Sequence, residues 1–303
     1  MDFLYFLQEL RNPVMDAIFS VLTHLGSEII VIGVLCLFFW CLDKKTAYKL
    51  CFTYFISGLA VQGLKIACRI ERPWIRDTKL YPVESAIEDA TGYSFPSGHT
   101  QSSTGLFSSL AFTFKKIWIY IAGFALIALV MFTRMYLGCH TPADVLVSFA
   151  ITVTVSFCVN YAYEHFKSSK TSNLIVFILI ELISLGLIAY SYYVITSGKS
   201  TVALAIDGFK AAGAGIGFGI GWFIEVTYVN FDPKGCKKIW QHILKLAIGI
   251  GVALLIKSGL KAIFGGESIV VNIIRYALAV VWIVGIFPII IKKFFSKNEI
   301  TKK

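Results

Sequence analysis

The sequence predicts an all-α membrane protein, a polytopic transmembrane helical bundle. Of its 303 residues, 57% are hydrophobic and only 15% are charged, whereas an ordinary soluble domain carries about 25% charged residues. Its mean hydropathy is +0.74, and the apolar residues fall in blocks of about 17–25, the length that crosses roughly 30 Å of hydrocarbon. This composition excludes a soluble enzyme, a nucleic-acid-binding module and a disordered tail. The net charge of +10 is interpreted as a signal of membrane orientation.

The N-terminal stretch and the apolar blocks define the expected elements. Residues 1–28 mix apolar and polar positions at helical spacing, which predicts interfacial helices, broken near Pro13, that lie on the bilayer. Nine candidate spans follow, at 29–42, 46–64, 100–114, 117–133, 142–163, 174–196, 201–228, 239–256 and 270–291.

Small residues and isolated acids within the spans favour packing roles. Gly213, Gly217 and Gly221 share one face of the seventh span, and small residues four apart let helices approach closely. Glu181 and Glu225 have no obvious cation partner in the sequence and are interpreted as structural. The seven cysteines are odd in number and include no CxxC pair, so neither a disulfide framework nor a zinc site is expected.

Lysine and arginine are divided unequally between the two membrane sides. One membrane side is defined by a long polar loop, about 65–99. All the loops on that side together carry nine cations: Lys65, Arg69, Arg72, Arg76, Lys79, Arg134, Lys199, Lys257 and Lys261. The other side carries fifteen: Lys44, Lys45, Lys49, Lys115, Lys116, Lys167, Lys170, Lys234, Lys237, Lys238, Lys292, Lys293, Lys297, Lys302 and Lys303. Because positive charge concentrates on the cytoplasmic side, the 65–99 loop is predicted to face outward.

Three polar clusters lie at the span ends on the side of this loop. Their members are Lys65 with Arg72-Pro73, then Pro96-Ser97-Gly98-His99, then Arg134 with His140 and Asp144. Polar residues at membrane depth are costly and indicate function.

The clusters contain the groups needed to bind and transfer a phosphoryl group. Lys65, Arg72 and Arg134 together would neutralise a dianion. Ser97 is placed to cap the third span, which leaves the Gly98 amide at a helix N-terminus for the same anion.

The two histidines are expected to have different roles. Asp144, four residues after His140, would hold one ring nitrogen as N–H and leave the other as a nucleophile. His99 has no carboxylate in its own cluster and would donate a proton to the leaving oxygen. This arrangement predicts phosphoryl transfer through a phosphohistidine, with three cations in place of a metal ion.

These residues resemble the type-2 phosphatidic-acid phosphatase superfamily, which also includes vanadium haloperoxidases and glucose-6-phosphatase. The family pattern is Lys-x6-Arg-Pro, Pro-Ser-Gly-His and Ser-Arg-x5-His-x3-Asp. The chain matches it except that Thr133 replaces the Ser and keeps the hydroxyl. The nine spans exceed the six usual for bacterial lipid phosphatases and are closer in number to the glucose-6-phosphatase branch.

The resemblance implies a site and a division of the chain. It assigns catalysis to His140, His99 and Asp144, and phosphate binding to Lys65, Arg72, Ser97, Gly98 and Arg134, with no metal and no other cofactor. The expected domains are interfacial helices at 1–28, a phosphatase core of six helices at 29–200 and about three additional helices at 201–303. The expected partners are the lipid bilayer and a phosphorylated lipid, and the expected location is a bacterial plasma membrane with the site on the extracytoplasmic side.

Several functions stay open at this point. The favoured one is hydrolysis of a lipid phosphomonoester or isoprenyl pyrophosphate, such as undecaprenyl pyrophosphate, phosphatidylglycerophosphate or phosphatidic acid. A phosphotransferase with a lipid or sugar acceptor and a sugar-phosphate phosphatase are enzyme alternatives. A transporter or scaffold is the non-enzyme alternative, and a vanadium haloperoxidase conflicts with the membrane composition.

Overall fold

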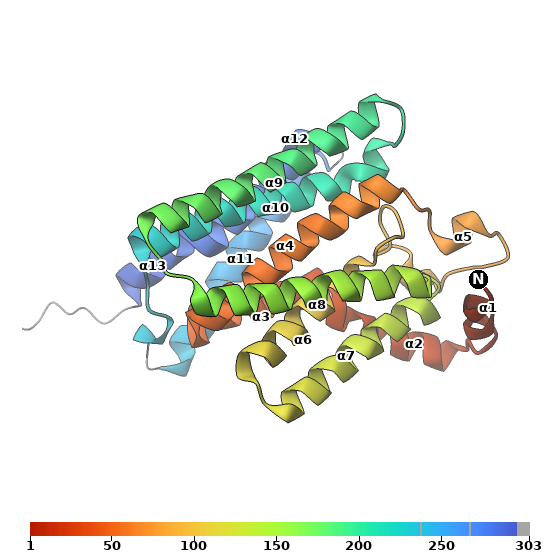
Figure 1. Cartoon of the computed structure of the whole chain (residues 1–303), viewed down its shortest axis with the longest axis horizontal. Helices are drawn as coiled ribbons and strands as arrows, with labels where there is room; N and C mark the ends of the chain where they lie inside the picture. The colour runs from red at the N-terminus through yellow and green to blue at the C-terminus, as the bar shows by residue number, and fades with distance from the viewer. Residues whose placement is uncertain (237, 267, 296–303) are drawn as a thin grey trace, which may run out of the picture. The chain divides into compact units, whose positions relative to one another are not determined.

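A computed structural model describes residues 1–236, 238–266 and 268–295. Over these ranges the chain is helical and forms no β-strand (Figure 1), which confirms the predicted all-α polytopic fold. Four lysines used in the orientation argument, Lys237, Lys297, Lys302 and Lys303, lie outside the described residues.

The chain forms two compact units. The first contains Met1–Ile32, Lys49–Glu164 and Tyr190–Gly208, and it holds all three polar clusters. The second contains Gly33–Tyr48, His165–Ala189 and, as far as it is described, Phe209–Lys303. The three-part division expected from the sequence stays a prediction.

The N-terminal stretch is broken at the proline that the sequence singled out. Helix α1 (Asp2–Glu9) is followed by α2 (Pro13–Leu22), and the Asn12 side chain caps α2 by accepting a hydrogen bond from the Met15 amide at 3.1 Å. A 3-10 turn, η1 (Thr23–Gly26), leads to α3 (Glu28–Leu37) and the π-helical segment η2 (Phe38–Leu42). In α1, Leu4 is buried against the protein, whereas Phe6 is exposed, so the helix has one protein-facing and one outward apolar face.

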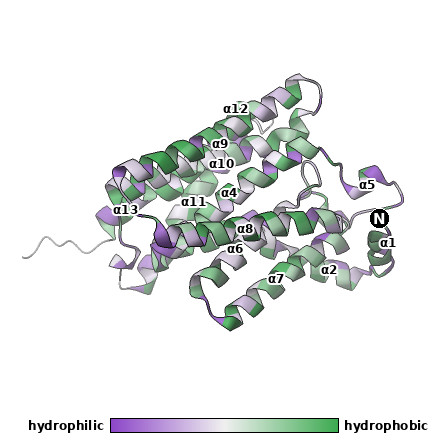
Figure 2. Ribbon diagram, viewed as in Figure 1, coloured by the Kyte–Doolittle hydropathy of each residue, from purple (hydrophilic) through white to green (hydrophobic). Residues whose placement is uncertain are grey.

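The remaining helices carry the long apolar segments. The first unit contributes most of α4 (Lys44–Cys68), all of α6 (Gly98–Phe114) and α7 (Ile117–Tyr136), and nearly all of α8 (Pro142–His165). Then come α9 (Lys170–Thr196), α10 (Val202–Ile224), η4 (Glu225–Val229), η5 (Pro233–Gly235), α11 (Ile239–Phe264), α12 (Ile269–Val281), η6 (Trp282–Ile286) and α13 (Phe287–Phe294). Figure 2 shows hydrophobic residues along most of α7 and α9.

The number of helices that qualify as spans is smaller than predicted. Seven described helical segments are long and apolar enough to cross a membrane, or eight if the bent pair Pro13–Gly26 and Glu28–Leu42 forms one span. The prediction was nine. Two predicted spans are missing from the seven. The span at 29–42 is found only as part of the bent pair. The span at 100–114 corresponds to α6, which is only 17 residues long and is rich in Ser and Thr.

Helix α6 is polar because it hydrogen-bonds to its neighbours inside the first unit. The Ser109 hydroxyl lies 2.9 Å from the hydroxyls of Thr53 in α4 and Ser156 in α8. Gln101 donates to the Ser57 hydroxyl in α4 at 2.8 Å. Hydroxyl and amide side chains commonly join packed membrane helices in this way, so polarity in α6 indicates a central position.

The predicted glycine seam is confirmed within the second unit. A Cβ on Gly213 would overlap the Ile273 carbonyl of α12, and a Cβ on Gly217 would overlap the Ala277 carbonyl one turn further on. Because Gly213 and Gly217 have no side chains, the backbones of α10 and α12 can approach each other closely.

The buried carboxylate of Glu225 forms an ion pair that the sequence did not reveal. Lys44 Nζ lies 3.1 Å from Glu225 Oε1 and 2.7 Å from Asn230 Oδ1. The ion pair agrees with a structural role for Glu225. Its partner was not obvious in the sequence because Lys44 lies about 180 residues earlier in the chain.

The long polar loop folds into short elements against α7. It contains α5 (Pro73–Arg76) and η3 (Glu84–Ala86). Ala86 packs in a core cluster with Tyr136, Leu137 and Cys139, and the Val83 amide donates to the Leu137 carbonyl at 3.0 Å. This anchoring holds residues 83–86 of the loop against the C-terminal end of α7.

Candidate active site

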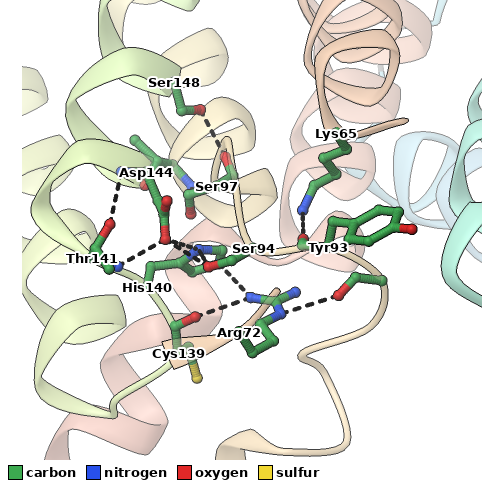
Figure 3. Close-up of polar contacts among 12 residues, drawn as sticks. Lys65, Arg72, Tyr93, Ser94, Ser97, Cys139, His140, Thr141, Asp144 and Ser148 are labelled. Atoms are coloured by element: carbon green, nitrogen blue, oxygen red, sulfur yellow. Dashed lines mark hydrogen bonds and ion pairs between the residues drawn. The ribbon is translucent and has the colours of Figure 1, made fainter. Parts of the chain in front are cut away.

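His140 is held between a carboxylate and a guanidinium in the first unit (Figure 3). It lies in the short connection between α7 and α8, and its exposed fraction is 2%. Asp144, in the first turn of α8, places Oδ2 3.4 Å from His140 Nδ1. The i,i+4 spacing in the sequence therefore brings the pair together as predicted.

Ser94 joins this pair and was not predicted. Its hydroxyl donates to Asp144 Oδ2 at 2.6 Å and lies 3.4 Å from His140 Nδ1. The Thr141 amide also donates to Asp144 Oδ2, at 2.8 Å. Two donors besides the imidazole thus fix the carboxylate, which keeps it oriented toward the ring.

Arg72 occupies the opposite side of the imidazole. Its Nη1 lies 2.9 Å from His140 Nε2, and because a guanidinium can only donate, Nε2 accepts and Nδ1 carries the proton. The guanidinium also donates to the carbonyls of Thr91 at 2.6 Å, Gly92 at 3.3 Å and Cys139 at 3.1 Å. Burial, and then the charge of Arg72, hold the pKa of His140 well below its ordinary value.

Lys65 is the second buried cation. It is 6% exposed near the C-terminal end of α4, and its Nζ donates to the Tyr93 carbonyl. The backbone at 91–93 therefore orients both Lys65 and Arg72, which explains how residues seven positions apart point to one place.

The N-terminus of α6 is built as the sequence predicts. Ser97 is the N-cap, and its hydroxyl accepts from the Thr100 amide at 3.4 Å. The Ser97 amide donates to the Asp144 carbonyl at 3.0 Å, and the Ser148 hydroxyl donates to the Ser97 carbonyl at 2.7 Å. These two bonds tie the start of α6 to α8. A Cβ on Gly98 would meet no described atom within 4 Å, so there is open space beside this N-terminus.

Arg134 is the third cation and is almost fully buried, with 1% of its surface exposed. Its Nη1 donates to the Thr23 hydroxyl of η1 at 3.2 Å. Its Nε and Nη2 have no hydrogen-bond partner among the described residues. Buried donors of this kind are costly unless an acceptor completes them, and a phosphate oxygen is a suitable acceptor.

His99 follows Gly98 in the first turn of α6. Gly26 of η1 packs against its backbone carbonyl, where a Cβ would lie 2.7 Å from the oxygen. Burial, and then the positive charges of Arg134 and Arg72, hold the pKa of His99 well below its ordinary value. The three clusters are thus brought to one place, although the catalytic roles of their members stay predictions.

The residues of this site that the sequence did not predict include Thr23, Tyr93 and Ser94. Each contributes a single hydroxyl or carbonyl from a segment without a recognisable spacing, so nothing in the sequence distinguishes them from ordinary loop or turn residues. The only signal for Tyr93 and Ser94 is their position immediately before the Pro96 cluster. Across the described ranges, no group of three His, Cys, Asp or Glu side chains is arranged to hold a metal ion.

Fold and site together define an integral membrane protein with a buried, cationic, histidine-containing centre. The family model described as PAP2 superfamily matches residues 46–168, which include every predicted site residue. A second model, PAP2 superfamily phosphatase, transmembrane extension, matches residues 209–299. The chain belongs to the PAP2 superfamily.

Relatives with curated names are distant, and several are lipid phosphatases. The chain is 26% identical over 275 residues to lipid phosphate phosphatase delta of Arabidopsis thaliana. The aligned region covers 83% of this chain and 63% of that protein. It is 28% identical to a probable sphingosine-1-phosphate phosphatase of Dictyostelium discoideum, over 53% of this chain and 41% of that one. It is 29% identical to an undecaprenyl-diphosphatase of Bacillus subtilis, over 48% of this chain and 74% of the relative. The chain thus spans less than two thirds of the first two relatives, and no solved structure gives a significant match.

Proposed function

We propose that the protein is an integral-membrane phosphatase that hydrolyses a lipid phosphomonoester or an isoprenyl pyrophosphate. The observation that carries the proposal is the buried His140, with Asp144 at Nδ1 and Arg72 at Nε2. Family membership and the names of the relatives support a phosphorylated lipid as the substrate.

The proposed reaction has two steps. In the first, the phosphoryl group accepts hydrogen bonds from Arg72, Lys65, Arg134 and the start of α6, and Arg72 releases Nε2 as it turns to the phosphate. The negative charge of the bound phosphate offsets Arg134 and Arg72, so that His99 takes up a proton. His140 Nε2 then attacks phosphorus, the bond to the leaving oxygen breaks, and His99 donates its proton to that oxygen. In the second step a water molecule attacks the phosphorus of the phosphohistidine, the bond between phosphorus and His140 Nε2 breaks, His99 accepts a proton from the water, and inorganic phosphate leaves.

Charge stabilisation in this reaction is assigned to side chains. In this proposal the phosphate binds among the three buried cations, and donors placed where negative charge develops lower the barrier most effectively. We expect turnover to persist in EDTA and to be inhibited by vanadate, which takes the trigonal-bipyramidal geometry of the transition state. Activity that is lost in EDTA and restored by magnesium would contradict this assignment.

The test of function is phosphate release by purified protein in detergent. The substrate panel contains isoprenyl pyrophosphates, phosphatidylglycerophosphate, phosphatidic acid and sugar phosphates, and His140→Ala is the matched variant. We expect release from at least one lipid and a loss of roughly a thousandfold or more in the variant, as is typical of a missing nucleophile. No release by the wild type from any substrate would overturn the proposal.

The remaining alternatives predict other outcomes, in this assay or in complementation of function in cells. A phosphotransferase would give phosphorylated acceptor rather than free phosphate when a lipid or sugar alcohol is added. A transporter or scaffold would bind lipid and complement function equally well with His140→Ala. These readouts separate the alternatives without further variants.

A further inference from the structure

Three consecutive backbone carbonyls face the active site, those of Thr91, Gly92 and Tyr93. The Thr91 carbonyl accepts from Arg72 Nη2 at 2.6 Å, and the Gly92 carbonyl accepts from Arg72 Nε at 3.3 Å. The Tyr93 carbonyl accepts from Lys65 Nζ. The atoms of Arg72 held in this way are not the Nη1 that contacts the catalytic imidazole. These carbonyls therefore fix the orientation of two cations to which we assign phosphate binding.

The side chains of the same segment point to another element of the first unit, the start of α10. The Thr91 hydroxyl donates to Asp207 Oδ2 at 2.6 Å. The Tyr93 hydroxyl donates to the Ser200 hydroxyl, just before α10, at 2.8 Å. Figure 3 shows the Tyr93 ring directed away from His140. Segment 91–93 is thus hydrogen-bonded to the catalytic cations on one side and to the start of α10 on the other.

Gly92 brings the two backbones into close contact. Its φ is +60°, a left-handed conformation that glycine adopts readily. A Cβ at this position would lie 3.2 Å from the Leu204 carbonyl oxygen of α10 and 3.4 Å from Asp207 Oδ2. The segment therefore has little room to move toward α10, and the two hydroxyl bonds oppose movement away from it.

The start of α10 lies outside both segments matched by the family models. The PAP2 match ends at residue 168, and the transmembrane-extension match begins at residue 209. Residues 200–207 are therefore an addition to the phosphatase core that contacts the segment behind its cations.

We infer that the start of α10 positions Arg72 and Lys65 for phosphate binding. Asp207 and Ser200 are the positioning residues, and they act through segment 91–93. The inference rests on the proposed function, because it concerns the cations to which that function assigns the phosphate. Without these contacts the segment would be free to shift, and Arg72 and Lys65 would lose their alignment with the phosphate.

The experiment removes the two hydroxyl donors and keeps the backbone carbonyls. Thr91 is exposed and Tyr93→Phe keeps the buried ring, so Thr91→Val and Tyr93→Phe should fold with an unchanged midpoint of thermal unfolding. We expect each variant to weaken calorimetric binding of vanadate and to lower kcat/KM roughly threefold, and the double variant roughly tenfold, because one hydrogen bond changes an equilibrium severalfold.

Conservative variants test the hydrogen bond to Asp207 itself. Thr91→Ser keeps the donor and Asp207→Asn keeps an acceptor oxygen, so both should retain most of the vanadate affinity, whereas Asp207→Leu should lose it as Thr91→Val does. Tyr81→Phe removes a hydroxyl from an exposed ring of the same loop and should change nothing. An equal loss in Asp207→Asn and Asp207→Leu would overturn the inference, because it would assign the effect to charge.

A double-mutant cycle shows whether Thr91 acts through Arg72. Lysine lacks the Nε and Nη2 donors that the two carbonyls hold, so Thr91→Val should cost little vanadate affinity in an Arg72→Lys background. A purely structural role predicts the same loss in both backgrounds. Equal losses, or wild-type affinity in Thr91→Val, would overturn the inference.

Vanadate binding requires no turnover, which separates this inference from the proposed function. If the wild type binds vanadate but releases no phosphate from any lipid, the proposed function fails and the binding series still tests the positioning. If it releases phosphate and the variants match it, only the positioning fails. Wild-type protein that neither binds vanadate nor releases phosphate would overturn both.

Discussion

Each nitrogen of the His140 ring has its own neighbour, and this asymmetry defines its chemistry. Asp144 and Ser94 hold the Nδ1 side, while Arg72 donates to Nε2. The sequence predicted His140 with Asp144 because four residues make one helical turn, so their contact is local. It could not predict the contact between Arg72 and Nε2, because the two residues are 68 positions apart and meet only through the fold.

At this scale the direction of the His140 pKa gives a prediction. Burial and Arg72 lower that pKa. The ring therefore stays neutral as the pH falls through roughly 6.5, the ordinary pKa of histidine, and takes up a proton only at lower pH. We expect nitrogen NMR of histidine-labelled protein to show a neutral ring with the proton on Nδ1 at pH 6.5. The signal is assigned by its disappearance in His140→Gln.

Removing the positive charge of Arg72 should raise the pKa of His140. In Arg72→Gln the positive neighbour is gone while burial remains, so the pKa of His140 should rise toward its ordinary value. A His140 signal that is already protonated at pH 6.5 in the wild type would contradict the account of the nucleophile.

Among the elements, the long apolar helices were predicted well. Helix α6 was predicted as a span at 100–114, but its hydrogen bonds to the neighbouring helices were not. Hydrophobic blocks indicate lipid-facing helices because lipid excludes polar groups. Helix α6 is short and polar because its hydroxyls bond to α4 and α8 instead. A hydropathy pattern cannot show that such a helix is hydrogen-bonded to its neighbours, since the partners of its side chains lie elsewhere in the chain.

The contact between α10 and α12 gives a prediction at the same scale. In Gly217→Ala the added Cβ would overlap the Ala277 carbonyl, a backbone atom that cannot rotate away. We expect a loss of about 1–3 kcal/mol in the free energy of unfolding, as is typical of overpacking. The measurement is thermal unfolding in detergent.

Gly251→Ala in α11 is the matched control, because a Cβ there meets no described atom within 4 Å. Alanine is also the better helix former, so this variant should be neutral or slightly stabilised. Equal behaviour of the two variants would show that the glycine seam does not determine packing.

For the whole molecule, the unequal distribution of Lys and Arg predicts orientation. We expect the loop that carries Thr78 to face outward and the α8–α9 connection with Lys167 to face the cytoplasm. In a cysteine-free background, Thr78→Cys in intact cells should react with a membrane-impermeant thiol reagent, and Lys167→Cys should react only after lysis. The reverse pattern would place the active site in the cytoplasm and exclude lipids of the outer leaflet as substrates.

The measurement that tests the central claim most directly is capture of the phosphoenzyme. Wild type and His140→Ala are mixed with a lipid substrate carrying radioactive phosphate, quenched within the first turnover and analysed for protein-bound label. We predict label on the wild type that is stable in base, lost in acid and located at His140, with none on the variant. Label at another residue, or phosphate release by His140→Ala at the wild-type rate, would contradict the account.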